Sequence, residues 1–243
     1  MSIESILLAV TRITTFSGNR KLTGATGFYF KRNKKLFLIT NRHVLIDEAN
    51  GHLPDSVEIL LHSDPTNLTS TGQFSMPLYD DNQAQWVEAK DSAGTVDVVA
   101  LPIDTAKFPK NILYTSFSED NIPRDLDEIE VGASIRAVGF PLGFHDTLHN
   151  LPVMRHAIIA SSFGLRFQGY GYFITDSLLH RGSSGSPIVA RISKRKSARS
   201  HFPWILLGIH SARLDTDNRE PQEDERINLF TAWYSDVLMT LTA

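Results

Sequence analysis

Short apolar runs rich in β-branched and aromatic residues recur along the chain, and Gly, Pro, Asn or charged residues separate them. Runs of this kind predict β-strands. The final residues, 235–241, instead predict a short helix, with Ser235 as a candidate N-cap. The chain is therefore predicted to be all-β. We expect its strands at 6–16, 24–30, 35–40, 56–62, 73–78, 85–89, 95–103, 134–141, 153–163, 170–175, 187–192, 204–211 and 227–233.

A polar stretch near the middle of the sequence, residues 105–131, predicts a connection between two parts of the chain. It carries Pro109 and Pro123 and ends in an acidic run. Proline cannot donate a hydrogen bond to a strand ladder, so a central strand is disfavoured here. We expect one domain over 1–115 and a second over 116–243.

One turn between predicted strands carries candidate chemistry, in the sequence Gly182-Ser183-Ser184-Gly185 before Pro187. Glycine has no Cβ, so a tight turn there can place the Ser184 hydroxyl in a cleft. The same turn can aim the amides of Gly182 and Ser184 at one point, as an oxyanion hole requires. The segment alone is equally compatible with a Gly/Ser-rich hairpin loop. A catalytic role needs a base and an acid from elsewhere in the chain.

Two earlier segments supply these groups. His43 follows an apolar run and the residues Thr40-Asn41-Arg42, and we expect it in a short helical turn. Asp97 lies within 94–103, a run that is otherwise largely apolar. A carboxylate in such a run is costly unless it is paired. A hydrogen bond to a histidine, with backbone donors beside it, would supply the pairing.

The three segments, in the order His, Asp, Ser, resemble the signatures of trypsin-like serine proteases of the chymotrypsin fold. Residues 40–44 resemble the TNxHV stretch of HtrA-type proteases, and 182–187 resemble the GxSGSP of glutamyl endopeptidases. The resemblance implies two antiparallel six-stranded β-barrels with the active site between them and a short C-terminal helix. It also implies His43 as base, Asp97 as the acid that orients it, and Ser184 as nucleophile.

The resemblance further implies a serine endopeptidase that works through an acyl-enzyme, with the amides of Gly182 and Ser184 as oxyanion hole. No cofactor or metal is expected. Ser183 stands where zymogen-type relatives carry an acid, and the chain lacks an IVGG-like start. Activation by N-terminal cleavage is therefore not expected.

Substrate selection is implied by the residues that line the family's first pocket and by the strand beside it. Leu178 replaces the acid of trypsins, which disfavours cleavage after Lys or Arg. His210 resembles the histidine with which glutamyl endopeptidases contact an acidic side chain, whereas Leu179 replaces their hydroxyl. An acidic residue and a medium apolar residue before the cut both stay open, and the apolar one is favoured. The expected substrate-binding residues are Leu178, Leu179, Ile209, His210, Ser211, Ala212 and Arg213.

Composition changes this picture little. The chain has 243 residues, no cysteine and a net charge of −3, so disulfides are excluded and nucleic acid is not favoured as a partner. The apolar run 6–10 is too short for a membrane span and lacks a basic region before it, so we expect a cytoplasmic protein with no membrane association. Residues 1–42 hold eight Lys or Arg and one acid.

Two further interpretations stay open. The basic run 194–199 is either a solvated hairpin tip or a docking patch for an acidic regulatory protein. The whole chain is either an enzyme or a catalytically silent protease-fold module that binds a peptide or a partner protein. His145 and His149 are four residues apart, but no third ligand is evident, so a metal site is disfavoured.

Overall fold

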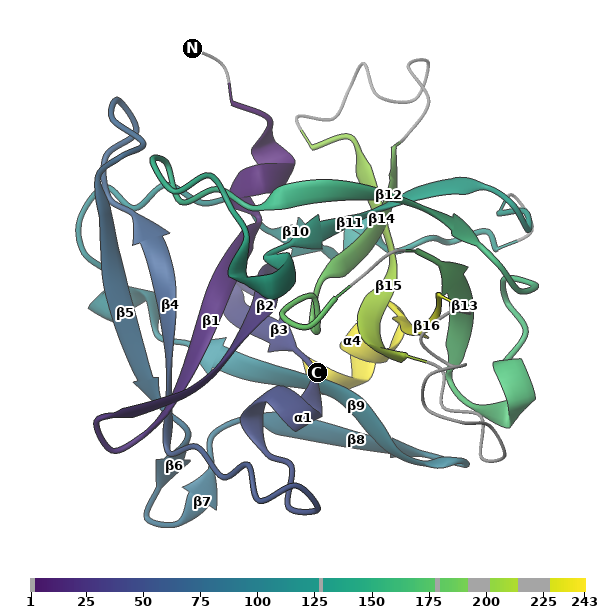
Figure 1. Ribbon diagram of the computed structural model, residues 1–243, viewed down its shortest axis with the longest axis horizontal. Helices are drawn as coiled ribbons and strands as arrows, with labels where there is room; N and C mark the ends of the chain where they lie inside the picture. The colour runs from purple at the N-terminus through teal and green to yellow at the C-terminus, as the bar shows by residue number, and fades with distance from the viewer. Residues whose placement is uncertain (1–2, 127–128, 178–179, 192–201, 214–227) are drawn as a thin grey trace.

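The computed structural model describes residues 3–126, 129–177, 180–191, 202–213 and 228–243. Two bodies built from β-strands lie side by side, one from the first half of the chain and one from the second (Figure 1). None of the helices in these residues is long and apolar enough to cross a membrane.

The first body is an eight-stranded sheet in which the strands of the main path follow the order β5-β4-β1-β2-β3-β9-β8. The eighth strand, β10, lies parallel to β2, and all other pairs are antiparallel. The strands are β1 (Val10–Ser17), β2 (Arg20–Arg32), β3 (Lys35–Thr40), β4 (Ser56–His62), β5 (Thr71–Pro77), β8 (Val87–Asp91), β9 (Gly94–Ile103) and β10 (Phe117–Ser118). A separate hairpin joins β6 (Tyr79–Asp80) and β7 (Gln83–Ala84).

The second body is a closed barrel of six antiparallel strands in the order β11-β12-β13-β16-β15-β14. A short helix, α4 (Val237–Leu241), follows it and packs against β8 and β9 of the first sheet. The strands are β11 (Ser134–Gly139), β12 (Val153–Ile159), β13 (Tyr172–Asp176), β14 (Pro187–Arg191), β15 (Trp204–Arg213) and β16 (Leu229–Tyr234).

The predicted all-β class, with two β-bodies and a C-terminal helix, is confirmed. The second body closes with six strands as expected, whereas the end strands of the first sheet, β5 and β8, are not paired with each other. The domain boundary between residues 115 and 116 stays a prediction.

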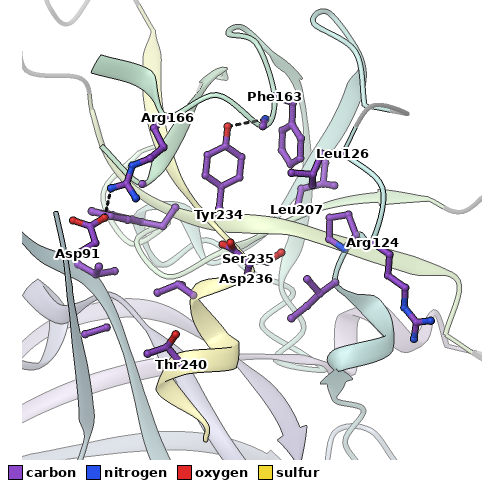
Figure 2. A pocket seen from close by; sticks show the side chains of 18 of the residues that line it. Asp91, Arg124, Leu126, Phe163, Arg166, Leu207, Tyr234, Ser235, Asp236 and Thr240 are labelled. Carbon is purple, nitrogen blue, oxygen red and sulfur yellow. Dashed lines mark hydrogen bonds and ion pairs between the residues drawn. The ribbon is translucent and has the colours of Figure 1, made fainter. Parts of the chain in front are cut away.

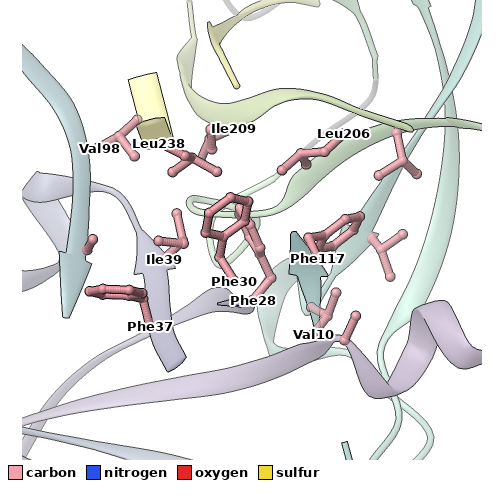
Figure 3. Packing of buried hydrophobic residues seen from close by; sticks show 14 of the residues in the cluster. Val10, Phe28, Phe30, Phe37, Ile39, Val98, Phe117, Leu206, Ile209 and Leu238 are labelled. Carbon is pink, nitrogen blue, oxygen red and sulfur yellow. The ribbon is translucent and has the colours of Figure 1, made fainter. Parts of the chain in front are cut away.

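One hydrophobic cluster joins the two bodies. Phe28 and Phe30 of β2 and Phe117 of β10 lie close to Leu206 and Ile209 of β15 (Figure 3). All five are essentially inaccessible to solvent. Burial of a large apolar side chain stabilises a fold by about 1.5–3 kcal/mol, so this shared core fixes the two bodies against each other.

Some predicted boundaries are wrong. The first strand begins at Val10 rather than at residue 6, because Ser5–Leu8 form a 3-10 helix, η1, whose Ile6 and Leu8 are buried. An apolar run this short is compatible with the periodicity of a helix and with that of a strand. The N-cap of α4 is Asp236, since Ser235 is buried and its amide donates to the Leu207 carbonyl. The remaining helices are α1 (Arg42–Leu45), η2 (Thr105–Lys107), η3 (Glu119–Asn121), η4 (Pro141–Gly143) and η5 (Phe167–Gly169).

Candidate active site

His43 and Asp97 lie next to each other because of the register between β3 and β9. Thr40, the last residue of β3, pairs with Val99, so the chain that continues into α1 passes Asp97. The Nδ1 atom of His43 lies 2.8 Å from Oδ2 of Asp97, and the His43 amide donates to Oδ1 at 2.9 Å. Both side chains are partly exposed, so a substrate can reach the ring.

Two further polar residues hold Asp97, and the sequence did not single out either for this role. The Ser211 hydroxyl donates to Oδ2 of Asp97 at 2.5 Å. The side-chain amide of the buried Asn41 donates to the Asp97 carbonyl at 2.7 Å. With the two bonds from His43, the Ser211 bond brings the number that the carboxylate accepts to three. These bonds offset the cost of placing a charge in an apolar strand.

The charge of Asp97 also acts on the His43 ring. Burial by itself lowers the pKa of His43, but the hydrogen bond and the negative charge of Asp97 outweigh it. The pKa of His43 therefore lies above its ordinary value of 6.5.

The loop between β13 and β14 carries Ser184 in a backbone shape that its glycines make possible. Gly182 and Gly185 have φ angles of +89° and +83°, in the region that favours glycine. The Gly185 amide donates to the His210 carbonyl, and the His210 amide donates back to Ser186. The loop is thus fastened to β15.

Thr26 of β2 fastens the same loop to the first body. Its amide donates to the Ser184 carbonyl at 3.0 Å, and its hydroxyl donates to the Gly182 carbonyl at 2.7 Å. That hydroxyl also accepts from the Phe140 amide at 3.1 Å. Thr26 is buried and sets the distance between the two bodies at this point. Nothing in its local sequence, Gly24-Ala25-Thr26-Gly27, announces this role.

The Ser184 hydroxyl lies 3.5 Å from the Ser211 carbonyl, to which it donates. Within the described residues no hydrogen bond joins it to His43. The amides of Gly182 and Ser184 likewise donate to no described group, so both are available to a ligand. This is the state expected of the predicted oxyanion donors.

His43 and Ser184 line the same open cleft, which has a volume of about 770 Å³. One wall is the start of β2, Arg20–Ala25, and another is the loop 47–52 after α1. Arg181 and Gly182, which belong to the same loop as Ser184, also line the cleft.

The predicted substrate-binding residues differ in where they lie and in how much of each residue the structure describes. Leu178, Leu179 and the predicted docking run 194–199 lie outside the described residues. Ile209 is buried in the core that joins the two bodies, and only the backbone of Ala212 and Arg213 is described.

His210 is also buried, and its Nδ1 atom has no hydrogen-bond partner in the described part of the chain. Burial first, and then the charge of His43, lower the pKa of His210 to about 3. Its ring is therefore neutral at physiological pH.

A second cavity, of about 500 Å³, is lined by a different set of residues (Figure 2). Phe163, Leu207 and Tyr234 line it, and Arg166 forms an ion pair with Asp91 at its rim. None of the predicted catalytic side chains borders it. Among the described residues no three His, Cys, Asp or Glu lie close enough together to hold a metal ion.

Substituting Gly185 by Ala is expected to destabilise the protein by about 4 kcal/mol or more, an effect that only severe clashes or strain produce. A Cβ at Gly185 would lie 2.1 Å from the Thr26 carbonyl oxygen and 2.5 Å from the Thr40 hydroxyl. Gly132 has the same φ, +83°, but open space around its Cβ position. Gly132→Ala should therefore cost only about 1–2 kcal/mol. Equal losses for both variants in denaturant unfolding would contradict this packing argument.

The chain is similar to known proteins in sequence pattern and in fold. A family model described as trypsin-like peptidase domain matches residues 25–194. No curated protein matches the chain. Three solved structures are similar to the chain at 14% to 17% identity, and this likeness concerns the fold. The chain spans less than two thirds of the length of the first two. These structures are the HtrA-type protease AlgW with a tripeptide (TM-score 0.56, 17% identity, 97% of this chain and 59% of that one), a serine endoprotease from Yersinia pestis (0.54, 15%, 97% and 62%) and an inactive mutant form of Rv3671c from M. tuberculosis H37Rv (0.52, 14%, 97% and 85%).

Proposed function

This chain belongs to the trypsin-like peptidase family, and from that premise we propose that it is a serine endopeptidase with a Ser-His-Asp triad. One observation carries the proposal: the Asp97 carboxylate binds Nδ1 of His43, and His43 shares a cleft with Ser184. A carboxylate on Nδ1 keeps the proton there and leaves Nε2 free to act as base.

In the first half of the proposed reaction, the Ser184 hydroxyl attacks the carbonyl carbon of the scissile peptide bond. Nε2 of His43 takes the hydroxyl proton, and the amides of Gly182 and Ser184 stabilise the negative oxygen that forms. The imidazolium, held by Asp97, then gives its proton to the leaving nitrogen. The C–N bond breaks, and the acyl group stays on Ser184.

In the second half a water molecule takes the place of the serine hydroxyl. His43 removes a proton from the water, which attacks the acyl carbon, and the proton passes to Ser184 as the ester bond breaks. The enzyme returns to its starting state. No cofactor takes part in the proposed reaction.

We propose that this enzyme needs no cleavage at its N-terminus. Ser183, directly before the nucleophile, is buried and its hydroxyl has no hydrogen-bond partner among the described residues. A neutral hydroxyl offers no charge to a new terminal ammonium group, unlike the acid of zymogen-type relatives. For the residue before the cut we propose a medium apolar side chain, with an acidic one as the alternative.

Covalent labelling tests the proposed function. A fluorophosphonate should form one covalent adduct per protein molecule, measured by mass spectrometry. Fragmentation of the labelled protein should locate the adduct on Ser184. The neighbouring Ser183→Ala variant is the matched control and should still be labelled. Absence of an adduct between pH 6 and 9, in a protein shown to be folded, would overturn the proposal.

The pH dependence of kcat/KM should follow the titration of His43. Because the pKa of His43 is raised, the imidazolium persists to higher pH, and it cannot act as a base. Activity should therefore fall as the pH drops, with a midpoint above 6.5. The negative charge of Asp47 contributes to the raised pKa, so Asp47→Asn should move the midpoint down slightly, whereas the remote Asp64→Asn should not. A rate that stays constant down to pH 5 would contradict the role of His43.

One observation favours a second candidate, a protease-fold module that binds a peptide or partner protein without turnover. The Ser184 hydroxyl donates to Ser211 rather than to His43. Catalytic hydrogen bonds are often long before substrate binds, so the geometry is compatible with both functions. Peptide binding that survives Ser184→Ala, together with no cleavage of a diverse peptide library, would support the module.

A further inference from the structure

We propose that the cleft beside His43 selects substrates that carry acidic residues on the leaving-group side of the cut. The inference rests on the proposed function, because it assigns part of the same site. It concerns the second to fifth residues after the scissile bond. Three features of the cleft carry it: a free strand edge, an excess of positive charge, and the position of both relative to Ser184.

The free edge belongs to β2. Arg20 and Lys21, and then Gly24 and Ala25, pair with β1 along one edge, with a register shift between the two pairs. On the other edge β3 pairs only from Phe28 onwards, so Arg20–Ala25 have no second strand partner within the described residues (Figure 1). These residues line the cleft. An extended peptide can therefore add there as a further strand, held by main-chain hydrogen bonds.

Fixed charges in the cleft are mostly positive. Arg20, Lys21 and Arg181 line it, all three are exposed, and none forms an ion pair with another described residue. Among the described residues that line the cleft, only Asp47 is acidic. Its carboxylate accepts from the Asn50 side chain at 2.7 Å, which lowers the pKa of Asp47 and keeps it ionised. Three positive charges against one negative charge favour an acidic ligand.

One cation next to His43 is neutralised by carboxylates and does not add to the charge of the cleft. Arg42, one residue before His43, binds both Glu48 and Glu88. It does not line the cleft. The cations that line the cleft are therefore Arg20 and Lys21 at the start of β2 and Arg181 on the Ser184 loop.

The position of His43 indicates which side of the cut the cleft receives. His43 must give its proton to the leaving nitrogen, so the leaving group lies on the side of Ser184 that faces the ring. On the other side, the Ser184 hydroxyl contacts β15 through the Ser211 carbonyl. No described residue of β15 lines the cleft. The acyl part of the substrate therefore follows β15, and the leaving part enters the cleft.

Distances along the strand set the reach of the cations. Arg181 directly precedes the oxyanion residue Gly182, close to the first residues after the cut. The Thr26 amide binds the Ser184 carbonyl, and Lys21 lies five residues earlier on β2. Five fully extended residues span about 16 Å, which is the upper limit here because the β1–β2 register shifts within this stretch. Acidic side chains two to five positions after the cut can thus approach Arg181, Lys21 and Arg20 in turn.

Matched peptides test the inference. Fluorogenic substrates with leucine, or in a second series glutamate, before the cut would carry either Glu or Gln at the second to fifth positions after it. We expect kcat/KM for the Glu peptide to exceed that for the Gln peptide about fivefold to tenfold in 50 mM salt, as several weak exposed pairs allow. The Glu-to-Gln ratio should fall below about twofold in 0.5 M salt, because at that salt concentration charges more than a few ångströms apart are screened from each other.

Charge reversal supplies the sharper test. In the double variant Arg20→Glu/Lys21→Glu, the Glu-to-Gln ratio should fall to one or below. Lys35→Glu makes the same kind of charge change at the opposite end of the β2–β3 hairpin and should keep the wild-type ratio. Because the two peptides are compared on the same variant, a general loss of activity cancels in the Glu-to-Gln ratio. A Glu-to-Gln ratio near one in the wild type, or a ratio unchanged by the double variant, would overturn the inference.

Failure of the proposed function would look different. An activated ester with no amino acid after the cut reports the triad alone, independently of the cleft. If the ester is not hydrolysed and no fluorophosphonate adduct forms, the proposed function fails. The inference can then still be tested by measuring, with fluorescence anisotropy, how the two peptides bind to the Ser184→Ala variant. Tighter binding of the Glu peptide supports the inference, and equal binding overturns it.

Discussion

Replacing Ser184 by Ala is expected to reduce kcat by about 10⁶-fold while leaving the fold intact, in line with the loss of a nucleophile from other serine hydrolases. The change removes the atom that forms the acyl bond. Among the described residues the hydroxyl makes one hydrogen bond, a long one of 3.5 Å to the Ser211 carbonyl, so its loss should cost less than about 1 kcal/mol of stability. Rates on a peptide substrate and unfolding by denaturant would measure the two effects separately.

Ser183→Ala is the control that separates chemistry from loop structure. Its hydroxyl is buried without a hydrogen-bond partner in the described part of the chain, so the variant should keep or slightly gain stability and retain its activity. If Ser184→Ala lost its activity only because it unfolded, or if Ser183→Ala lost as much activity as Ser184→Ala, the assignment of the nucleophile would be wrong.

The sequence was most informative where a residue carries a local signature. His43 lies in the short helical turn that its Thr-Asn-Arg context predicted, and the chain leading to it runs antiparallel to the strand of Asp97. Their contact could be expected because a charged residue inside an apolar strand needs a partner. The order of the three motifs then suggested that Ser184 lies nearby.

Supporting residues could not be predicted in this way, because their roles depend on contacts between distant strands. Thr26 binds Gly182 and Ser184, more than 150 positions away, through a hydroxyl that no motif marks. Ser211 was singled out as a substrate-binding residue, and the bond from its hydroxyl to Asp97 was not predicted. Threonine and serine occur in many strands, and only the folded arrangement of the sheet and the barrel shows which of them lie at the site.

The acidic preference proposed for the cleft has a similar origin. The excess of Lys and Arg in residues 1–42 is visible in the sequence, but solvated hairpin tips explain it equally well there. The fold brings Arg20 and Lys21 to the same cleft as Arg181, although about 160 positions separate them. Arg42 contributes less to the charge of the cleft, since it is bound by Glu48 and Glu88.

Substituting Asp97 by Asn should lower kcat by about 10⁴-fold, although the side chain keeps its shape. The carboxylate accepts from three donors: the His43 amide on Oδ1, and Nδ1 of His43 and the Ser211 hydroxyl on Oδ2. An asparagine has only one oxygen. With that oxygen toward the His43 amide, its NH₂ group meets Nδ1, which must then become the acceptor. The proton moves to Nε2, and the ring can no longer accept the proton of Ser184.

The matched variant Ser211→Ala removes one donor but leaves the carboxylate and the histidine tautomer in place. We expect it to lower kcat by about tenfold or less, because the two bonds from His43 remain. Nitrogen-15 NMR of the imidazole should show Nδ1 protonated in the wild type and in Ser211→Ala, and Nε2 protonated in Asp97→Asn. An Asp97→Asn enzyme that keeps more than a tenth of the wild-type kcat, or that keeps its proton on Nδ1, would show that the carboxylate does not control the base.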